Sequence, residues 1–573
     1  MPDLRKAPSF AVRYTGHYAY FSEKPQKYPA PYPFILQEAR FAAARYARSV
    51  AYHNGMDRVF GQGILRVYFV GIGGVSMSAL ALYLHAMGYL VSGYDSSPSI
   101  YTDRLIQKGI AVSFHPCPTD MQGAQAVILS GAIAANEPHA AYARKHRLPT
   151  LTRAQLLGRI SRLHSTCIAV SGCHGKTTVT AMLAAILIQA GKSPTVLLGG
   201  DAKETGGNLR LGMLPPCRHS RLCGKYTVKK APSLARLAKS KNTKRALSRS
   251  PLVAEACEYQ RAFLQLSPTH AVLLNTDHDH PDCYPTAADA LAAFGDFLGR
   301  VKRGGRVFLS ADDTGAEGLT RGRAITFGLR EGADLRAIPI QPDGEGTAGR
   351  TPLSDAGKES RASDTSPCDT AEKGADGQSF DLFYFGKHLC RINSPLFGLY
   401  NVQNACAATA VALSLGIHPS AVKSALEAFT GVARRRERLG SYRGAEVISD
   451  YAHHPSEIAA TLTAEAGRQK KYAVIFQPHT YTRTRAFLHA FSRALSIAEQ
   501  VILLPVYAAR EPCIEGIYEA LVSATAQLTH CIGAGDVASA LRLLFAEGER
   551  YDRILLLGAG DIDAQGRRAT ENR

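Results

Sequence analysis

A glycine-rich segment at 171–178 reads Ser-Gly-Cys-His-Gly-Lys-Thr-Thr and lies between the apolar run 167–170 and the small apolar residues 179–190. This order predicts a strand, a tight turn and a helix. Glycines let backbone N–H groups close on phosphate oxygens, and the helix N-terminus adds the positive end of its dipole. Lys176 can neutralise terminal phosphates, and the Thr177 hydroxyl can ligate Mg²⁺. The segment therefore predicts a nucleoside-triphosphate site, with an ordinary turn and a surface lysine as the alternative.

Carboxylates and histidines follow two further apolar runs. Glu255 ends the run 252–255, and the segment 275–282, which contains His280, follows the next predicted strand. Ligands gather where the carboxyl ends of parallel strands meet. Oxygen ligands suit Mg²⁺. Zinc is less favoured, because the cluster contains no cysteine thiolate at a spacing typical of a tetrahedral zinc site. We predict a magnesium site beside the triphosphate; a solvated acidic turn is the alternative.

A glycine turn at 71–74 joins a predicted strand (64–70) to a predicted helix (76–87), and the next strand ends at Asp95. This β-α-β arrangement is typical of a Rossmann-like nucleotide-binding unit. Ser76 stands in place of the third glycine of that pattern. The turn predicts a site for a nucleotide or nucleotide-sugar, and a tight turn without a ligand is the alternative.

The last third of the chain carries two histidine- and tyrosine-containing segments, 450–457 and 476–483, each after a predicted strand. Such paired strand ends predict a binding rim. Three arginines at 434–436 are candidates for clamping a transferred phosphate, because guanidinium groups match phosphate oxygens. A solvated run of charge is the alternative for these arginines.

The bulk composition indicates a globular protein of about three or four domains for 573 residues. Hydrophobic residues make up 46% and charged residues 20% of the chain. We find no apolar run near the roughly 20 residues that span a bilayer, and no signal-peptide core. Twelve cysteines include no C-x-x-C pair, which predicts reduced thiols in the cytoplasm. We therefore expect a cytoplasmic protein without membrane insertion.

The net charge of +19 is concentrated in one segment. Eleven Lys or Arg residues and no Asp or Glu lie between 218 and 249, and without them the charge is 19 − 11 = +8. A nucleic-acid-binding protein is the alternative function that this segment raises. Because the basic excess is local, we expect no nucleic-acid partner. Deleting 214–250 would separate the two interpretations: in a nucleic-acid-binding protein the deletion abolishes salt-sensitive DNA binding and leaves ATPase turnover intact.

Alternating strands and helices predict an α/β protein with mostly parallel sheets. We predict an N-terminal extension at 1–62, with Met56 as a possible true start, and a Rossmann-like domain at 63–160. A central nucleotide-binding domain is predicted at 161–430 and a third domain at 431–573. Two insertions, near 214–250 and 341–379, interrupt the central domain; the second is rich in Gly, Ser, Asp, Thr and Pro.

The same segments resemble the Mur ligases. The resemblance is carried by 71–78, 174–178, 255–259, 275–282, 401–405, 434–435, 450–457, 476–484, 508–511 and 558–562, which occur in family order. It implies Rossmann-like N- and C-terminal domains that flank a central P-loop ATPase. It also implies ATP- and Mg²⁺-dependent joining of L-alanine to UDP-N-acetylmuramate through an acyl phosphate, in peptidoglycan synthesis. Adding a preformed murein peptide to the same sugar is the alternative, and a tripeptide acceptor would distinguish the two.

The resemblance also implies roles for individual residues. The implied ATP-binding residues are Gly172, Cys173, His174, Gly175, Lys176, Thr177, Thr178, Asn401, Asn404, Arg435 and Asp450. The implied metal ligands are Thr177, Glu255 and His280. The implied UDP-sugar residues are Gly71, Gly73, Gly74 and Asp95, and the implied amino-acid residues are Tyr451, His453, His479 and Arg483. The implied catalytic residues are Lys176, His280, Arg435, His453 and Arg483.

Four residues depart from the family pattern: Ser76, Cys173, Tyr400 and Thr480 stand where glycine, threonine, histidine and arginine are common. None of them removes an implied ligand, so we expect activity with altered substrate contacts. A nicotinamide dehydrogenase would need NAD at the turn 71–76, and no residue downstream supplies hydride chemistry. The sequence leaves the oligomeric state and the strictness for L-alanine open.

Overall fold

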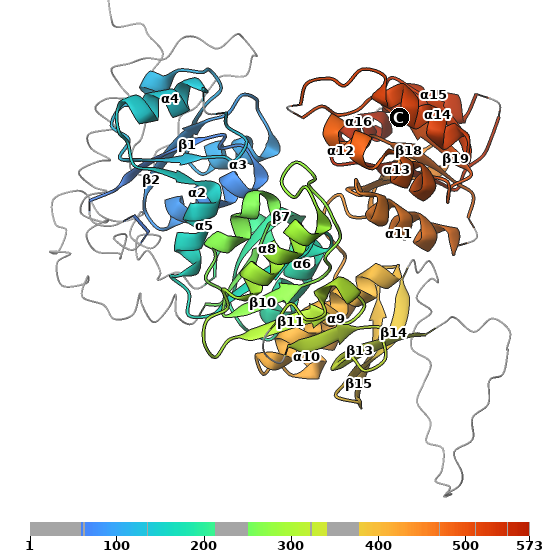
Figure 1. Ribbon diagram of the computed structural model, residues 1–573, viewed down its shortest axis with the longest axis horizontal. Helices are drawn as coiled ribbons and strands as arrows, with labels where there is room; N and C mark the ends of the chain where they lie inside the picture. The colour runs from blue at the N-terminus through green and yellow to red at the C-terminus, as the bar shows by residue number, and fades with distance from the viewer. Residues whose placement is uncertain are drawn as a thin grey trace, which may run out of the picture.

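The computed structural model describes residues 59–571, with gaps at 61–62, 135, 213–249, 321–323, 341–376, 469, 510 and 547. Most of the predicted N-terminal extension and of both predicted insertions lies outside the described residues. Val59 is 2% exposed and its carbonyl accepts a hydrogen bond from Arg159, so the packed part of the chain begins before residue 63. The three-domain α/β architecture predicted from the sequence is confirmed, and its three bodies follow one another along the chain (Figure 1).

The first body is a sheet of five parallel strands covered by helices. Its elements are β1 (Arg66–Val70), α2 (Val75–Ala86), β2 (Leu90–Tyr94), α3 (Ile100–Gln107), β3 (Ala111–Ser113), β4 (Ala126–Leu129), α4 (Pro138–Lys145), β5 (Thr150–Thr152) and α5 (Arg153–Ser161). The strand order is β3-β2-β1-β4-β5. β1 is central and buried from Val67 to Val70, because both of its faces are covered by helices.

The middle body is a ten-stranded sheet that carries the phosphate-binding segment. Its elements are β6 (Cys167–Ser171), α6 (Lys176–Gln189), β7 (Thr195–Ala202), β8 (Gly207–Arg210), β9 (Leu252–Glu255), β10 (His270–Leu273), α8 (Ala287–Leu298), β11 (Arg306–Ser310), β12 (Ile325–Gly328), β13 (Leu335–Ile340), β14 (Gln378–Tyr384), β15 (Lys387–Ser394), α9 (Leu399–Ser414) and α10 (Pro419–Ala428). The order is β15-β14-β13-β12-β11-β10-β6-β9-β7-β8, parallel from β13 to β7 and antiparallel at both edges.

The register of this sheet brings the predicted site segments together. Val170 of β6 pairs with Glu255 of β9 on one side and with Val272 of β10 on the other. The loops that follow β6, β9 and β10 therefore leave the sheet at one edge. α6 packs beside α9 in one apolar core, and the first turn of each helix lies at this same edge. β14 begins at Gln378, inside the range predicted for the second insertion.

The third body is a six-stranded sheet with the order β16-β17-β21-β18-β19-β20, in which only the β16–β17 pair is antiparallel. Its elements are β16 (Glu437–Tyr442), β17 (Ala445–Asp450), α11 (Pro455–Ala466), β18 (Tyr472–Phe476), α12 (Tyr481–Ala486), α13 (Leu488–Leu495), β19 (Gln500–Leu503), α14 (Ile517–Ala526), β20 (His530–Gly533), α15 (Val537–Leu544), β21 (Arg553–Leu557) and α16 (Ile562–Glu571).

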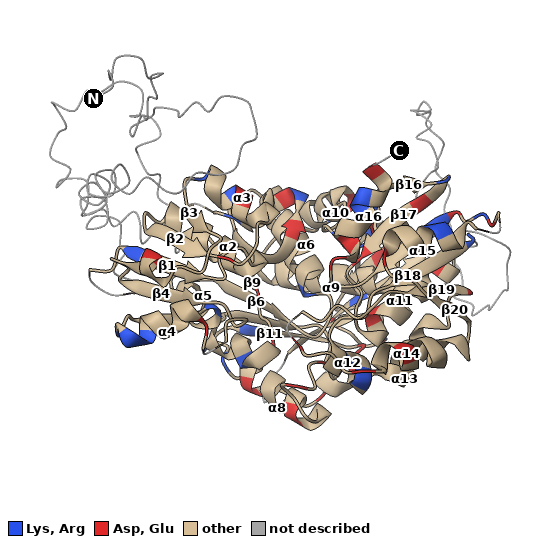
Figure 2. Cartoon of the chain, turned by 90° about the horizontal axis from the view of Figure 1, so that it is seen from above, with Lys and Arg blue, Asp and Glu red and all other residues tan. Residues whose placement is uncertain are grey.

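Charged residues are interspersed along the outer helices, while the strands are mostly uncharged (Figure 2). The basic segment 218–249 lies outside the described residues. Within the described part of the chain, no helix combines the length and the apolar character needed to cross a bilayer.

Candidate active site

The phosphate-binding segment forms a tight loop between β6 and α6. Gly172 and Gly175 have φ angles of 130° and 82°, which L side chains rarely adopt. A Cβ atom at Gly175 would lie 2.5 Å from the Asn404 side-chain oxygen. The loop is also held by the segment after β10, because the Asn275 side chain accepts from the His174 N–H at 2.9 Å. Glycine is thus required here, as the sequence predicts for a loop that closes on phosphate.

The Lys176 ammonium group lies inside this loop. Its Nζ donates to the carbonyls of Gly172 (2.6 Å) and Cys173 (2.9 Å), and to both carboxylate oxygens of Glu258 (3.0 and 2.9 Å). Burial disfavours the charge, but the Glu258 carboxylate outweighs it and raises the pKa of Lys176. Lys176 is therefore a fully charged cation held where phosphates would enter the loop.

The predicted metal ligands lie in two places around the loop. Thr177 hydrogen-bonds to Glu255, whose pKa is raised by burial, and Glu255 accepts from the Gly199 N–H at 2.5 Å. His280 Nε2 lies 3.5 Å from Glu258 Oε1 instead. A carboxylate with a hydroxyl, and a carboxylate with an imidazole, are donor sets that Mg²⁺ accepts beside phosphate. The donor chemistry therefore fits the predicted magnesium.

Glu258 has no role in the sequence-based prediction, although the structure places it at the centre of the site. The available signal was the spacing Glu255-Ala-Cys-Glu258, which puts a second carboxylate just past a buried strand. Glu258 is 3% exposed. It touches both Lys176 and His280.

A cavity of about 500 Å³ opens between the middle and third bodies. The predicted ATP-binding residues among its lining are His174, Gly175, Thr178, Asn401, Asn404, Arg435 and Asp450. The N-terminal end of α9 lies at the cavity, because Asn401 and Asn404 line it; Asn401 also donates to the Phe397 carbonyl at 2.8 Å. Tyr400 also lines it, in the place where the family pattern has histidine.

Residues of the third body close this cavity through Glu457. Arg435 Nη1 lies 3.1 Å from Glu457 Oε1, and His174 Nδ1 of the phosphate loop lies 3.3 Å from the same oxygen. Burial works against the charge of Glu457, but Arg435 and His174 outweigh it and hold its pKa well below the usual value. Asp450, at the end of β17, is buried, and burial raises its pKa. The arginine predicted to clamp phosphate is thus paired within the third body, and His174 of the middle body contacts the same carboxylate across the domain boundary.

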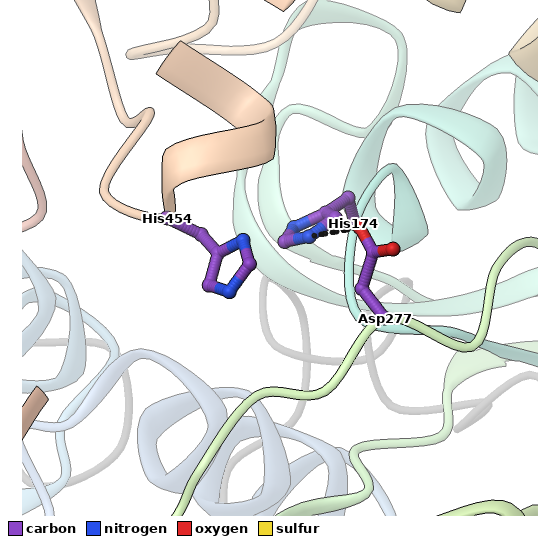
Figure 3. Close-up of side chains that lie close together, drawn as sticks. All are labelled: His174, Asp277 and His454. Atoms are coloured by element: carbon purple, nitrogen blue, oxygen red, sulfur yellow. Dashed lines mark ion pairs between the residues drawn. The ribbon is translucent and has the colours of Figure 1, made fainter. Parts of the chain in front are cut away.

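His174, Asp277 and His454 are the one group of three possible metal-ligating side chains that converge within 4.8 Å in the described residues (Figure 3). His174 Nε2 lies 3.0 Å from Asp277 Oδ2, and its other nitrogen faces Glu457. Burial opposes protonation of His174, but Glu457 and Asp277 outweigh it and raise its pKa to about 9. Protonated His174 forms an ion-pair bridge between Asp277 and Glu457, and the His454 ring packs against the His174 ring with centroids 4.9 Å apart. Ser456 completes it by donating to Asp277 at 2.8 Å.

This bridge predicts a pH dependence of stability. The stabilisation by protonated His174 is complete below pH about 6.5 and is lost as the pH rises through about 9. Between those pH values the unfolding free energy of the wild type is expected to fall by about 2 kcal/mol more than that of His174→Gln, which lacks the titrating group. Chemical denaturation at pH 6.5 and 9.5 measures it, with exposed His115→Gln as the control. An unchanged pH slope in His174→Gln would show that the bridge contributes nothing.

The predicted amino-acid residues gather around two histidines. The His453 and His479 rings are 5.9 Å apart, and His479 stacks on Tyr507. Burial lowers the pKa of His479 to about 3, so this ring is neutral. Tyr451 lies at the edge of the group, where its carbonyl contacts His453 Nδ1 at 2.9 Å.

Arg483 joins this group to the metal residues. Its Nη2 donates to Asp279 Oδ1 at 2.8 Å and lies 3.4 Å from His280 Nδ1. Arg483 and Asp279 are both about 5% exposed. In this conformation the guanidinium predicted to bind a substrate carboxylate is therefore occupied by a carboxylate of the protein.

The glycine turn of the first body is braced by Asp95. Gly71 has a φ of 79°, and the Gly73 N–H donates to Asp95 Oδ2 at 2.7 Å. Gly74 is the N-cap of α2, which begins at Val75. Arg104 of α3 forms an ion pair of 2.8 Å with Asp201 of β7, which ties this body to the middle one. The first residue of α2 also contacts the middle body, because Asn208 of β8 donates to the Val75 carbonyl at 2.6 Å.

These three sheets, with a phosphate loop on the middle one, define a multidomain α/β nucleotide-binding protein. Three Mur ligase family models match successive parts of the chain: the catalytic domain at 66–165, the middle domain at 170–412 and the glutamate ligase domain at 434–560. The chain belongs to the Mur ligase family.

Curated relatives and solved structures agree with this family. The UDP-N-acetylmuramate–L-alanine ligase of Desulfosudis oleivorans is 34% identical over 508 residues, which cover 87% of this chain and 96% of the relative. That of Alkaliphilus metalliredigens is 32% identical over 502 residues, covering 87% and 95%. The crystal structure of the UDP-N-acetylmuramate-alanine ligase MurC of Thermotoga maritima matches with a TM-score of 0.66 at 25% identity, covering 88% and 98%. A murein peptide ligase of Psychrobacter arcticus, at 20% identity and a TM-score of 0.60, shares the fold.

Proposed function

We propose that this protein joins L-alanine to the lactyl carboxylate of UDP-N-acetylmuramate with hydrolysis of ATP to ADP and phosphate. The observation that carries the reaction type is the line of contacts from Lys176 through Glu258 and His280 to Arg483. It connects the phosphate loop to the amino-acid residues of the third body. The curated relatives, matched over nearly their whole length, support the two substrates.

The reaction proceeds in two transfers. A lactyl carboxylate oxygen attacks the γ-phosphorus of ATP, and ADP leaves. The amine of alanine then attacks the carbonyl carbon of the acyl phosphate; the C–O bond to phosphate breaks, and the nitrogen loses a proton. Catalysis needs no protein nucleophile and consists of positioning and charge neutralisation.

Each part of the site has a task in these transfers. Lys176 would neutralise phosphate charge from inside the loop and Arg435 from the lining of the cavity. Arg483 would turn from Asp279 to the alanine carboxylate. Thr177, Glu255 and His280 would hold Mg²⁺, which when bound neutralises phosphate oxygens. The glycine turn at 71–74 would hold the UDP group. Because the reaction consumes ATP, we place the protein in the cytoplasm.

Phosphate release from ATP and Mg²⁺ tests this function, with UDP-N-acetylmuramate and each amino acid or a murein tripeptide added in turn. We expect release that requires both the sugar nucleotide and L-alanine. Release that requires the tripeptide would identify the recycling ligase instead. Release that ignores the sugar nucleotide would contradict the proposal.

A further inference from the structure

The carboxylate of Glu258 contacts both Lys176 of the phosphate loop and His280, a predicted Mg²⁺ ligand. Both of its oxygens bind Lys176, and Oε1 is also 3.5 Å from His280 Nε2. Burial alone would raise the pKa of Glu258, but Lys176 outweighs it and lowers that pKa. Glu258 is therefore a buried anion whose charge depends on its cationic neighbours.

Tyr284 is hydrogen-bonded to the backbones of both Glu258 and His280. Its hydroxyl donates to the Glu258 carbonyl at 2.5 Å, and its N–H donates to the His280 carbonyl at 2.9 Å. Tyr284 is itself 2% exposed. His280 has a φ of 58° and is further held by Asp279, which accepts from its N–H. A buried tyrosine thus joins the backbones of Glu258 and His280, whose side chains lie 3.5 Å apart.

Nucleotide binding must disturb this arrangement. The three protons of the Lys176 ammonium are directed to two loop carbonyls and to Glu258, so none is left for a phosphate. When Lys176 turns to a triphosphate, Glu258 loses its cation while it remains buried. A buried charge without a partner is strongly destabilising. Another cation must then replace Lys176 beside Glu258. The neighbouring residue His280 is a predicted Mg²⁺ ligand, so a Mg²⁺ ion held by His280 would supply that cation.

We propose that Glu258 is a positioning residue that changes partners: it holds Lys176 in the nucleotide-free protein and joins His280 as a ligand of Mg²⁺ when ATP binds. This inference rests on the proposed ATP- and Mg²⁺-dependent function. The exchange makes metal-free ATP a poor ligand, because Lys176 cannot leave Glu258 without a replacement cation. It also makes binding of ATP and of Mg²⁺ mutually dependent.

Glu258→Gln tests the exchange, because it keeps the size of the side chain and removes the charge. ATP affinity is measured by calorimetry in EDTA and across a Mg²⁺ titration, with neither sugar nucleotide nor alanine present. In EDTA, ATP is expected to bind the variant several-fold more tightly, because Lys176 is released and a negative charge is gone. For each protein, the titration gives the Mg²⁺ concentration at which the gain in ATP affinity is half complete. This concentration is expected to be about tenfold or more higher in Glu258→Gln than in the wild type.

In Glu258→Gln, ATP binding is expected to strengthen without Mg²⁺, while more Mg²⁺ is needed to promote it. These opposite effects distinguish the proposed role from a purely structural one. If Glu258 only supports the fold, Glu258→Gln will weaken ATP binding both with and without Mg²⁺, and that result would overturn the proposal. Exposed Glu317→Gln is the matched control and is expected to change neither affinity. If Glu258→Gln lacks a cooperative unfolding transition, Glu258→Asp replaces it: metal-free affinity is expected to stay within about threefold while the Mg²⁺ requirement rises. An unchanged Mg²⁺ requirement in Glu258→Asp would also overturn the proposal. Failure of the unsubstituted protein to bind ATP would instead contradict the proposed function.

Discussion

Lys176→Ala is expected to reduce ATP-dependent phosphate release by at least about 10²–10³-fold, the effect of removing one preorganised charge-stabilising donor. Lys176 is the first residue of α6 and the cation at the centre of the phosphate loop. No described residue of the loop could replace its charge, since Cys173 and Thr177 are uncharged and His174 is engaged by Asp277 and Glu457. The measurement is phosphate release at saturating substrates.

The loss must be separated from unfolding, because Lys176→Ala also leaves Glu258 without its cation. Lys192→Ala provides the matched control: this lysine follows α6 at its other end and is exposed. We expect Lys192→Ala to retain activity within about twofold, as for surface substitutions in general. Folded Lys176→Ala that keeps more than a tenth of the wild-type turnover would contradict the assigned role.

The sequence predicted the buried parallel strands with little error. β6 and β9 coincide with the runs predicted at 167–170 and 252–255, and both are buried because helices cover both faces of the sheet. The strand β15, Lys387–Ser394, was not predicted. It is an edge strand whose polar residues face solvent, and such a pattern resembles a loop.

The structure brings many of the predicted site residues near one another, but the sequence did not predict how they pair. Local pattern placed Lys176, Glu255 and His280 at strand ends that share one sheet edge, and the register of β6 explains why that works. It did not predict that Arg483 faces Asp279, 204 positions earlier in the chain. Such pairs depend on how separate bodies pack, which no local periodicity encodes.

The second large effect is expected in the third body, at Glu465. This residue of α11 is 0% exposed and accepts from Arg436 at 2.6 Å and from Arg553 at 2.8 Å. Burial opposes its charge, and Arg436 together with Arg553 lowers its pKa. Glu465→Ala would leave two arginines in a buried setting without this carboxylate. Breaking a buried pair in this way costs about 3–5 kcal/mol, so we expect a loss of that size in the unfolding free energy.

The same substitution reports on how stability and the site are connected. Arg436 lines the nucleotide cavity, so its release by Glu465→Ala is expected to weaken nucleotide binding as well as the fold. Denaturant unfolding and nucleotide binding are measured on the same sample. Glu549→Ala is the control, since Glu549 pairs with Lys471 at the surface and is expected to change stability by less than about 0.5 kcal/mol. If the Glu465→Ala and Glu549→Ala variants are equally stable, the prediction is wrong. The free-energy cost of burying the charges would then equal the free energy gained by pairing them. The buried cluster would in that case contribute specificity of packing and not stability.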